Sequence, residues 1–431
     1  MKTISIFWFR RDLRLDDNKG LYYALQENDN IVPIFIYDKN ILDEIKKNDH
    51  RIQFIKNRID EINKDLSKTG KSINQFYGDP LKVFKKLIEK YQIKNIYLNR
   101  DYTPYSIKRD SQIFNLSKKQ NIEYKDYKDH VIYEKSDITK DDGSPYKVYT
   151  PYSKKWLAKL KLDGIKNYPS EKLIQNLTNI ESGFNFSSIG FNKPSVTLSK
   201  LNLSKKVIDE YEMTRNFPSK DATSKIGVHL RFGTISTRKL VTQAKLSSNI
   251  TFLKELVWRE FFQQILYHFP HTVSKSFKPQ YDRIEWLNNE DDFLKWCDGK
   301  TGYAFVDAGM RELKKTGFMH NRVRMLVGSF LCKHLLIDWR WGEAYFREKL
   351  FDYETASNIG NWQWVAGCGV DAAPYFRIFN PHEQIKKFDK DLKYVKKWVP
   401  EFNTQSYIGT IVDHKFARQR CLEVYKKALK Q

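Results

Sequence analysis

One segment, ELVWREFF at residues 255–262, combines a carboxyl group with aromatic rings at helical spacing. Glu255, Trp258 and Phe262 stand at positions i, i+3 and i+7, so on a helix they share one face. A carboxyl group beside an indole can bind a flat ring with polar edges, because it supplies a hydrogen-bond partner next to a stacking wall. An ion pair between Glu255 and Arg259 beside a core tryptophan explains the same pattern, so both interpretations stay open.

A second segment, GFMHNRVRM at residues 317–325, places two arginines near the start of a predicted helix. Asn321, Arg324 and Met325 fall on one stripe of that helix, and Arg322 points elsewhere. Arginines in this position can contact phosphate groups, and they can equally form a solvated basic face. The segment therefore marks a candidate anion site with a simpler alternative.

A third segment, TSKIGVHLRFGTIS at residues 223–236, begins with two hydroxyl residues, Thr223 and Ser224. Such residues cap helices, and a helix N-terminus also binds anions because its N–H groups point outward. Ordinary capping is the commoner use of this pattern.

Two tryptophans, Trp362 and Trp364, stand two positions apart, which separates them by about 200° around a helix. One of them can therefore face the core while the other faces a cavity. A buried indole near a redox cofactor can relay an electron, and an exposed indole can stack on a nucleobase.

Composition limits the classes of partner. Lys and Arg total 75 and Asp and Glu total 52, a net charge of +23, which favours a polyanionic partner but also fits a general Lys bias. The four cysteines, Cys297, Cys332, Cys368 and Cys421, stand apart from any second Cys or His at ligand spacing. We expect reduced core thiols, and neither a metal site nor disulfides.

The N-terminal segment becomes charged too soon for a signal peptide, and no apolar run is long enough to span a membrane. The sequence therefore predicts a cytoplasmic protein without a membrane partner.

The first third of the chain alternates apolar runs with helical periodicity, which is typical of a doubly wound parallel sheet. The predicted strands are residues 4–9, 31–37, 73–78 and 96–99, and the predicted helices between them include residues 51–66 and 81–91. No GxGxxG motif follows a strand, so the dinucleotide-binding fingerprint is absent from this Rossmann-like domain.

The rest of the chain changes character twice. Residues 157–206 are rich in Ser, Asn, Lys and Gly with weak periodicity, and from residue 206 the pattern is helical to the end, as in 241–269 and 320–350. We expect an α/β domain at 1–130, an interdomain linker at 131–205 and an all-α domain at 206–431.

Six segments carry a resemblance to the photolyase/cryptochrome family, in order and at family spacing. They are WFRRDLRLDDN (8–18), YKVYTPYSKKW (146–156), WREFF (258–262), KTGYAFVDAGMREL (300–313), FMHNRVRM (318–325) and NWQWVAGCGVDAAPYFRIFNP (361–381). The resemblance implies an α/β antenna-type domain followed by a helical domain that binds FAD and DNA lesions. Within the family, the chain is most similar to the bacterial branch that splits cyclobutane pyrimidine dimers.

The resemblance also implies the FAD-binding positions. They are Tyr211, Thr223, Ser224, Lys225, Ile226, Gly227, Phe252, Arg259, Asn321, Arg324, Asp352, Tyr353, Glu354 and Asn358. Asn358 matches the position that faces flavin N5. Gly227 stands where the family often has Ser, and Glu354 where it often has Asp, so both are expected to alter flavin affinity.

Electron-transfer and DNA-binding positions follow in the same way. Trp362, Trp339 and Trp286 match the family's tryptophan chain from flavin to surface. The positions that match contacts to DNA and to the lesion are Arg215, Glu255, Trp258, Arg259, Asn321, Arg322, Met325, Trp364 and Gln384.

The implied activity is light-dependent repair of dimers in damaged DNA by electron transfer from excited reduced FAD to a flipped-out dimer. Glu255 would stabilise negative charge that develops on the dimer. The alternatives are a cryptochrome-type blue-light receptor, a (6-4) photolyase, and a helical DNA-binding protein without flavin. We expect a monomer.

A second, light-harvesting chromophore of the deazaflavin or folate type belongs to the same resemblance. Tyr105 and Ser106 stand where an Asn-Glu pair is associated with folate binding. A deazaflavin, another flavin and an empty antenna pocket therefore all stay open.

Overall fold

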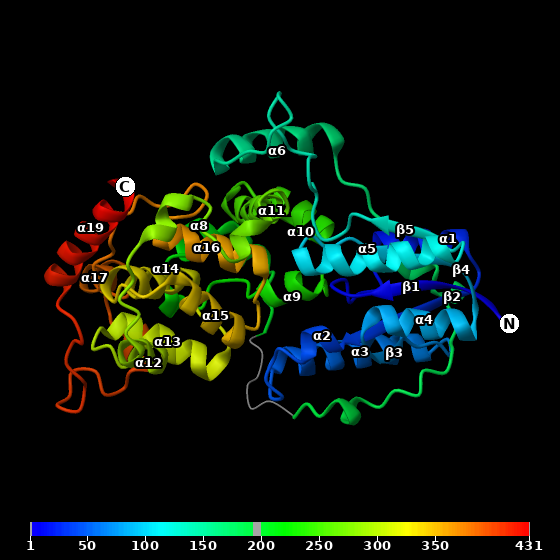
Figure 1. The fold of residues 1–431 in the computed structure, drawn as a ribbon, viewed down its shortest axis with the longest axis horizontal. Coiled ribbons are helices and arrows are strands. Elements are labelled where there is room, and N and C mark those ends of the chain that lie inside the picture. The colour runs from blue at the N-terminus through cyan, green and yellow to red at the C-terminus, as the bar shows by residue number, and fades with distance from the viewer. Residues whose placement is uncertain (1, 193–199, 431) are drawn as a thin grey trace. The chain divides into compact units, whose positions relative to one another are not determined.

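The computed structural model describes residues 2–192 and 200–430, which form two compact units (Figure 1). The α/β unit comprises Met1–Asp137, Trp156–Ser195 and Gly227–Leu246. The helical unit comprises Ile138–Lys155, Val196–Ile226 and Ser247–Gln431.

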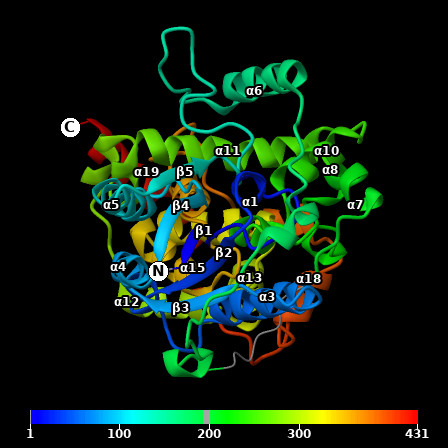
Figure 2. The same cartoon turned by 90° about the vertical axis from the view of Figure 1, so that its right-hand side faces the viewer.

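The α/β unit is built on a five-stranded parallel sheet in the order β3-β2-β1-β4-β5. The strands are β1 (Thr3–Phe9), β2 (Ile31–Asp38), β3 (Asn74–Gly78), β4 (Gln92–Asn99) and β5 (Glu123–Tyr127). The helices are α1 (Lys19–Glu27), α2 (Lys39–Leu42), α3 (His50–Ser67), α4 (Pro80–Lys90) and α5 (Pro104–Lys119). Figure 2 shows α4 and α5 on one side of the strands and α1 and α3 on the other.

The predicted doubly wound sheet is confirmed, and its central strands are buried on both faces, as such sheets require. The four predicted strands and two predicted helices agree with the observed elements to within four residues. The fifth strand, β5, was not predicted.

The predicted linker at 131–205 differs from what is observed. Its described part contains α6 (Tyr149–Asp163) and short 3-10 helices at Ser170–Lys172, Ile174–Asn176 and Phe186–Ile189, while residues 193–199 lie outside the described residues. Tyr152, Trp156 and Leu160 recur every fourth residue and are buried, so α6 has an apolar stripe that begins before residue 157.

The predicted start of the helical domain at 206 also differs from the observed division. Helices α9 (Gly227–Phe232) and α10 (Thr237–Lys245) belong to the α/β unit. A buried ion cluster holds them there, because Arg238 contacts the carboxylates of Asp17 and Asp129 at 3.1 and 2.9 Å and Asp129 also pairs with Arg14 at 2.6 Å. Sequence periodicity does not reveal such contacts.

Most helices of the C-terminal half of the helical unit contribute to one large apolar core. Its helices are α7 (Lys205–Asp209), α8 (Tyr211–Thr214), α11 (Thr251–His268), α12 (Glu290–Asp298), α13 (Ala304–Thr316), α14 (Asn321–Ser329), α15 (Trp339–Lys349), α16 (Thr355–Ala366), α17 (Pro381–Phe388), α18 (Lys393–Trp398) and α19 (His414–Lys430). Short 3-10 helices lie at Pro218–Lys220, Pro270–Val273 and Pro279–Arg283, and a π-helix at Phe330–His334 follows α14. Helix α16 packs against α11, α14 and α15.

The four cysteines are free and buried, as predicted. None of the helices in residues 2–192 and 200–430 combines the length and apolar character that crossing a bilayer requires.

Replacing Asp129 should destabilise the protein strongly. Burial alone would raise the pKa of Asp129, but Arg14 and Arg238 outweigh burial and lower that pKa. Asp129→Ala leaves two buried guanidinium groups without their shared carboxylate, which should lower the free energy of unfolding by about 3–5 kcal/mol. The free energy of unfolding from denaturant titration measures this loss.

The matched control is Asp16→Ala, because Asp16 pairs with Lys239 in a solvent-exposed ion pair worth at most about 1 kcal/mol. Because the pKa of Asp129 is lower in the folded than in the unfolded state, its carboxylate stabilises the fold fully above the unfolded-state pKa of about 3.9. This stabilisation is lost as the pH falls below that pKa. Equal stability losses in the two variants would contradict the role of the buried cluster.

Candidate functional site

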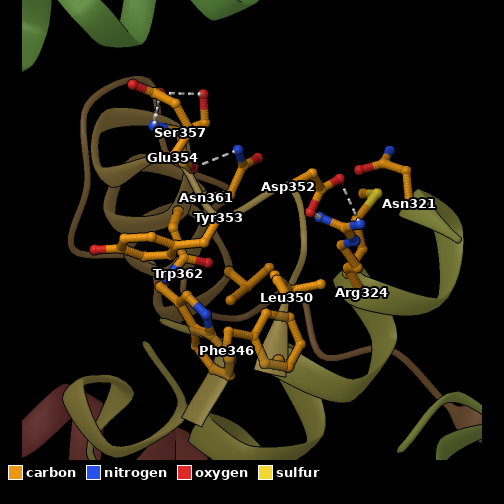
Figure 3. A pocket seen from close by; sticks show the side chains of 14 residues that line it. Asn321, Arg324, Phe346, Leu350, Asp352, Tyr353, Glu354, Ser357, Asn361 and Trp362 are labelled. Carbon is orange, nitrogen blue, oxygen red and sulfur yellow. Dashed lines mark hydrogen bonds and ion pairs between the residues drawn. The ribbon is translucent and has the colours of Figure 1, made fainter. Parts of the chain in front are cut away.

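A pocket in the helical unit lies between α14, α15 and α16 (Figure 3). Its empty space, counting the part open to solvent, is about 580 Å³. Seven of the predicted FAD and lesion positions line it, together with Trp362 of the predicted tryptophan chain: Asn321, Arg324, Met325, Asp352, Tyr353, Glu354 and Asn358. The structure therefore brings together residues from positions 321 to 362.

One wall of this pocket carries a fixed ion pair. Arg324 donates from both terminal nitrogens to the two carboxylate oxygens of Asp352, at 3.2 and 2.9 Å. Its Nε donates to the carbonyl of Met319 at 2.7 Å. Because all three nitrogens are engaged, the guanidinium plane is held in one orientation at the pocket (Figure 3).

The start of α16 forms the opposite wall. Glu354 caps this helix, because its Oε2 accepts from the backbone N–H of Ser357 at 3.1 Å and from the Ser357 hydroxyl at 3.0 Å. Gln263 of α11 donates to the other carboxylate oxygen of Glu354. The extra methylene of Glu354 relative to Asp therefore extends a carboxylate that caps the helix and joins α16 to α11.

Asn358 is held by a residue that the sequence did not single out. Its Nδ2 donates to Oε1 of Glu343 at 3.0 Å, and the Tyr353 hydroxyl donates to the same oxygen at 3.3 Å. Burial raises the pKa of Glu343. In sequence, Glu343 stands four residues before Arg347, so it resembles half of an exposed ion pair, and no local signal distinguishes it.

The floor of the pocket contains Trp362, which is only 3% exposed. Its ring lies 5.0 Å from Phe346 and 6.2 Å from Trp296, both in edge-to-face geometry. Gly342 of α15 makes this seat possible, since a Cβ there would lie 2.1 Å from the Trp362 ring. Helices α15 and α16 therefore approach closely because position 342 has no side chain.

A second group of predicted residues gathers along α8 and α11. Arg215 pairs with Glu255 at 2.5 Å and lies 5.3 Å from the centre of the Tyr211 ring. That ring meets Phe252 edge to face at 5.3 Å. The Trp258 indole is stacked on Tyr149, and Arg259, the next residue of α11, is partly buried.

The segment 223–226 borders another pocket. Thr223 and Lys225 line it together with residues 200–202 and Asp221. The Thr223 hydroxyl is buried without a hydrogen-bond partner in the part of the chain that the structure describes. Lys225 pairs with Asp221 at 2.9 Å and lies 3.9 Å from the Phe318 ring centre. A buried free hydroxyl beside a lysine suits an anionic group.

Of the other residues in this segment, Ser224 is buried and its carbonyl accepts from Asn202, and Ile226 is half-buried. Gly227 is the first residue of α9 in the α/β unit.

The remaining predicted residues lie outside these groups. Of the predicted tryptophan chain, Trp362 and Trp339 are both buried, and Trp286 is half-buried. Only the last member, Trp286, is therefore more exposed than the one before it. Trp364 is half-buried at the edge of the core. Arg322 donates to the Asn216 amide oxygen at 2.5 Å and lies over Phe388 of α17, the helix that also carries Gln384.

Two family models match this chain. Residues 5–172 match the model described as DNA photolyase, and residues 252–406 match the FAD binding domain of DNA photolyase. Deoxyribodipyrimidine photo-lyase from Agrobacterium fabrum is 34% identical to the chain, and the alignment covers 99% of this chain and 98% of that protein. The chain belongs to the DNA photolyase family. The Escherichia coli deoxyribodipyrimidine photo-lyase is 30% identical over 99% of both chains.

Solved structures of the family share the fold. A class III photolyase from Agrobacterium tumefaciens has a TM-score of 0.87 at 32% identity, covering 100% of this chain and 98% of that one. An archaeal photolyase from Sulfolobus tokodaii with two FAD molecules has a TM-score of 0.82 at 33% identity, covering 99% and 100%. A Synechocystis cryptochrome, at 24% identity, a TM-score of 0.84 and coverage of 98% and 99%, shares the fold alone.

Membership of the family confirms the predicted fold class and places the FAD-binding domain in the helical unit. The side chains fit FAD, because the amide of Asn358 and the guanidinium of Arg324 line this pocket. Thr223 and Lys225, the latter paired with Asp221, line a separate pocket.

A methyl group at position 342 should damage this pocket. Gly342→Ala drives Cβ into the Trp362 ring, and overpacking of this kind costs about 1–3 kcal/mol. We expect a lower melting temperature and less FAD per protein after purification, read from the ratio of flavin to protein absorbance. Gly409→Ala is the control, because a Cβ there meets no atom within 4 Å. An unchanged flavin ratio in Gly342→Ala would contradict the role assigned to this contact.

Proposed function

We propose that this photolyase-family protein repairs cyclobutane pyrimidine dimers in DNA under blue light. The observation that carries the proposal is the similarity to deoxyribodipyrimidine photo-lyases over 99% of the chain. The side chains of the pocket and of the Arg215–Glu255 cluster support it, because they supply a cofactor site and an acidic, aromatic surface in the same helical unit.

Binding of DNA starts with the cationic side chains. Burial lowers the pKa of Arg322, and the positive charges of Arg215 and Arg377 lower it further, so positive charge gathers around Arg322. Such a cluster is relieved by phosphate groups, which contact many basic side chains without regard to base sequence. We assign Arg215, Arg322 and Gln384 to the DNA backbone.

Recognition of the lesion falls to Glu255 and Trp258, together with Asn321, Met325 and Trp364. A dimer stacks and pairs poorly, so it leaves the duplex at lower cost than normal bases. The Trp258 indole offers it a stacking surface, and the Glu255 side chain offers hydrogen bonding to its polar edge. We assign Arg259 and Asn321 both to this group and to the FAD-binding positions.

When it is bound, reduced and excited by light, FAD supplies one electron to the dimer. The electron later returns, so there is no net redox change. Asn358 presents its amide to the pocket, held there by Glu343. Trp362, Trp339 and Trp286 form the proposed route by which electrons reach the flavin from outside.

For the antenna chromophore, only the chemical class is proposed. The Sulfolobus tokodaii photolyase has two FAD molecules, and a second flavin is accordingly among the candidates for the α/β unit, beside a deazaflavin and a folate. We also propose that the protein acts as a cytoplasmic monomer.

Removing the stacking surface should weaken the binding of damaged DNA and leave the binding of undamaged DNA almost unchanged. Trp258→Ala loses base stacking worth about 1–3 kcal/mol, so damaged DNA should bind about ten- to a hundredfold more weakly. Undamaged DNA should bind almost as before, because phosphate contacts dominate its affinity. The measurement is titration with matched dimer-containing and dimer-free duplexes at one salt concentration, followed by blue light and a count of remaining dimers.

The control is Phe114→Ala, which removes an exposed ring of the α/β unit and should alter neither affinity. If the unmutated protein bound both duplexes equally and removed no dimers under blue light, the repair assignment would fail. A receptor function would then be the better interpretation.

The outer member of the tryptophan route can be tested by itself. Trp286 is half-buried and does not line the pocket, so Trp286→Phe should leave FAD content unchanged while most light-driven reduction of oxidised FAD is lost. Absorbance at flavin wavelengths during illumination with a soluble electron donor reports the rate. Trp341 is also half-buried but lies outside the proposed route, so in Trp341→Phe the flavin should be reduced by light at the rate of the unmutated protein. Equal rates in both variants would remove Trp286 from the route.

A further inference from the structure

The strongest unexplained contact near the proposed lesion site is made by Tyr149, the first residue of α6. Its ring is stacked on the Trp258 indole, with ring centres 3.6 Å apart and planes 7° apart. Tyr149 is 9% exposed, whereas Trp258 is only partly buried. One face of the indole is therefore covered by a ring that solvent hardly reaches.

Tyr149 is itself fixed at three places. Its hydroxyl donates to the carbonyl of Lys254 at 2.7 Å, and its backbone N–H donates to Oδ2 of Asp371 at 3.0 Å. Its ring also meets Phe261 edge to face at 5.9 Å. Lys254 directly precedes Glu255 on α11, so Tyr149 is tied to the same helix that carries both the carboxylate and the indole.

These ties determine what the Trp258 side chain can do. Rotation of the indole out of its plane would break a face-to-face contact with a ring that cannot follow it, because Tyr149 is anchored at its hydroxyl and at its backbone. Trp258 consequently keeps its orientation relative to Glu255 in the DNA-free protein. A side chain that is already ordered loses less freedom when a ligand binds.

We propose that Tyr149 is a positioning residue for lesion recognition: by stacking on Trp258 it holds the indole where a flipped dimer meets it. This inference rests on the proposed function. It assigns no contact between Tyr149 and DNA, so its effect must pass through Trp258.

The test measures affinities for matched dimer-containing and dimer-free duplexes at one salt concentration. Tyr149→Leu removes the aromatic pair and should weaken binding of damaged DNA about two- to tenfold, which is the usual range for such pairs. Binding of undamaged DNA should not change. Tyr149→Phe keeps the stacked ring and loses only the hydroxyl, so it should retain most of the discrimination.

A double-mutant cycle distinguishes positioning from general destabilisation. If Tyr149 acts through Trp258, then Tyr149→Leu combined with Trp258→Ala should bind damaged DNA no more weakly than Trp258→Ala alone. If Tyr149→Leu folds poorly by melting temperature, Tyr149→Met, whose unbranched side chain adapts to irregular space, takes its place in the cycle.

Three results would overturn the inference: unchanged discrimination in Tyr149→Leu, additive losses in the double variant, or tighter binding of damaged DNA by Tyr149→Leu. The last would mean that the tyrosine ring occupies the place of the lesion and is displaced by it. Failure of the unmutated protein to prefer damaged DNA would instead refute the proposed function, and this inference with it. A preference in the unmutated protein with no change in Tyr149→Leu would refute only the inference.

Discussion

Close approach of helices to α16 is the constraint on which the candidate site depends. Gly342 of α15 leaves room for the Trp362 ring, and Gly360 of α16 leaves room for Phe262 of α11, where a Cβ would lie 2.2 Å from the phenyl ring. Two neighbouring helices can therefore pack closely on α16, and their polar side chains reach one another. The Glu343–Asn358 and Gln263–Glu354 hydrogen bonds span these same two contacts. A helix packed at a larger distance would deprive each of these carboxylates of one hydrogen-bond partner, which is costly for a buried group.

Buried charge is handled differently in the two units. In the α/β unit, Asp129 is shared by Arg14 and Arg238, and the cluster joins segments more than a hundred residues apart. In the helical unit, the Arg324–Asp352 pair lies at a pocket wall and stays partly exposed. The first arrangement stabilises the fold. The second keeps the guanidinium of Arg324 in one orientation at the pocket wall, where an unpaired guanidinium would move.

Periodicity and family motifs predict a large part of this structure from sequence, and their failures have physical causes. The central strands are continuous apolar runs, so they are recognisable, whereas β5 reads EYKDY and only its packing on β4 makes it a strand. The stripe of α6 was overlooked because the segment around it is polar. Pairings such as Arg215 with Glu255, 40 residues apart, depend on tertiary packing that no local pattern encodes. For the same reason the sequence points to Trp258 but not to the ring that covers it.

The same fold occurs in proteins named photolyase and in one named cryptochrome. The Synechocystis cryptochrome and the Sulfolobus tokodaii photolyase superimpose on this chain about equally well, with TM-scores of 0.84 and 0.82, although their identities to it are 24% and 33%. One backbone therefore accommodates both kinds of protein, and the difference lies in the side chains that line its sites. In this chain, Glu255 and Trp258 are held by Arg215 and Tyr149, and both partners come from outside α11. These two contacts fix the carboxylate and the indole of α11 against residues from other segments of the helical unit.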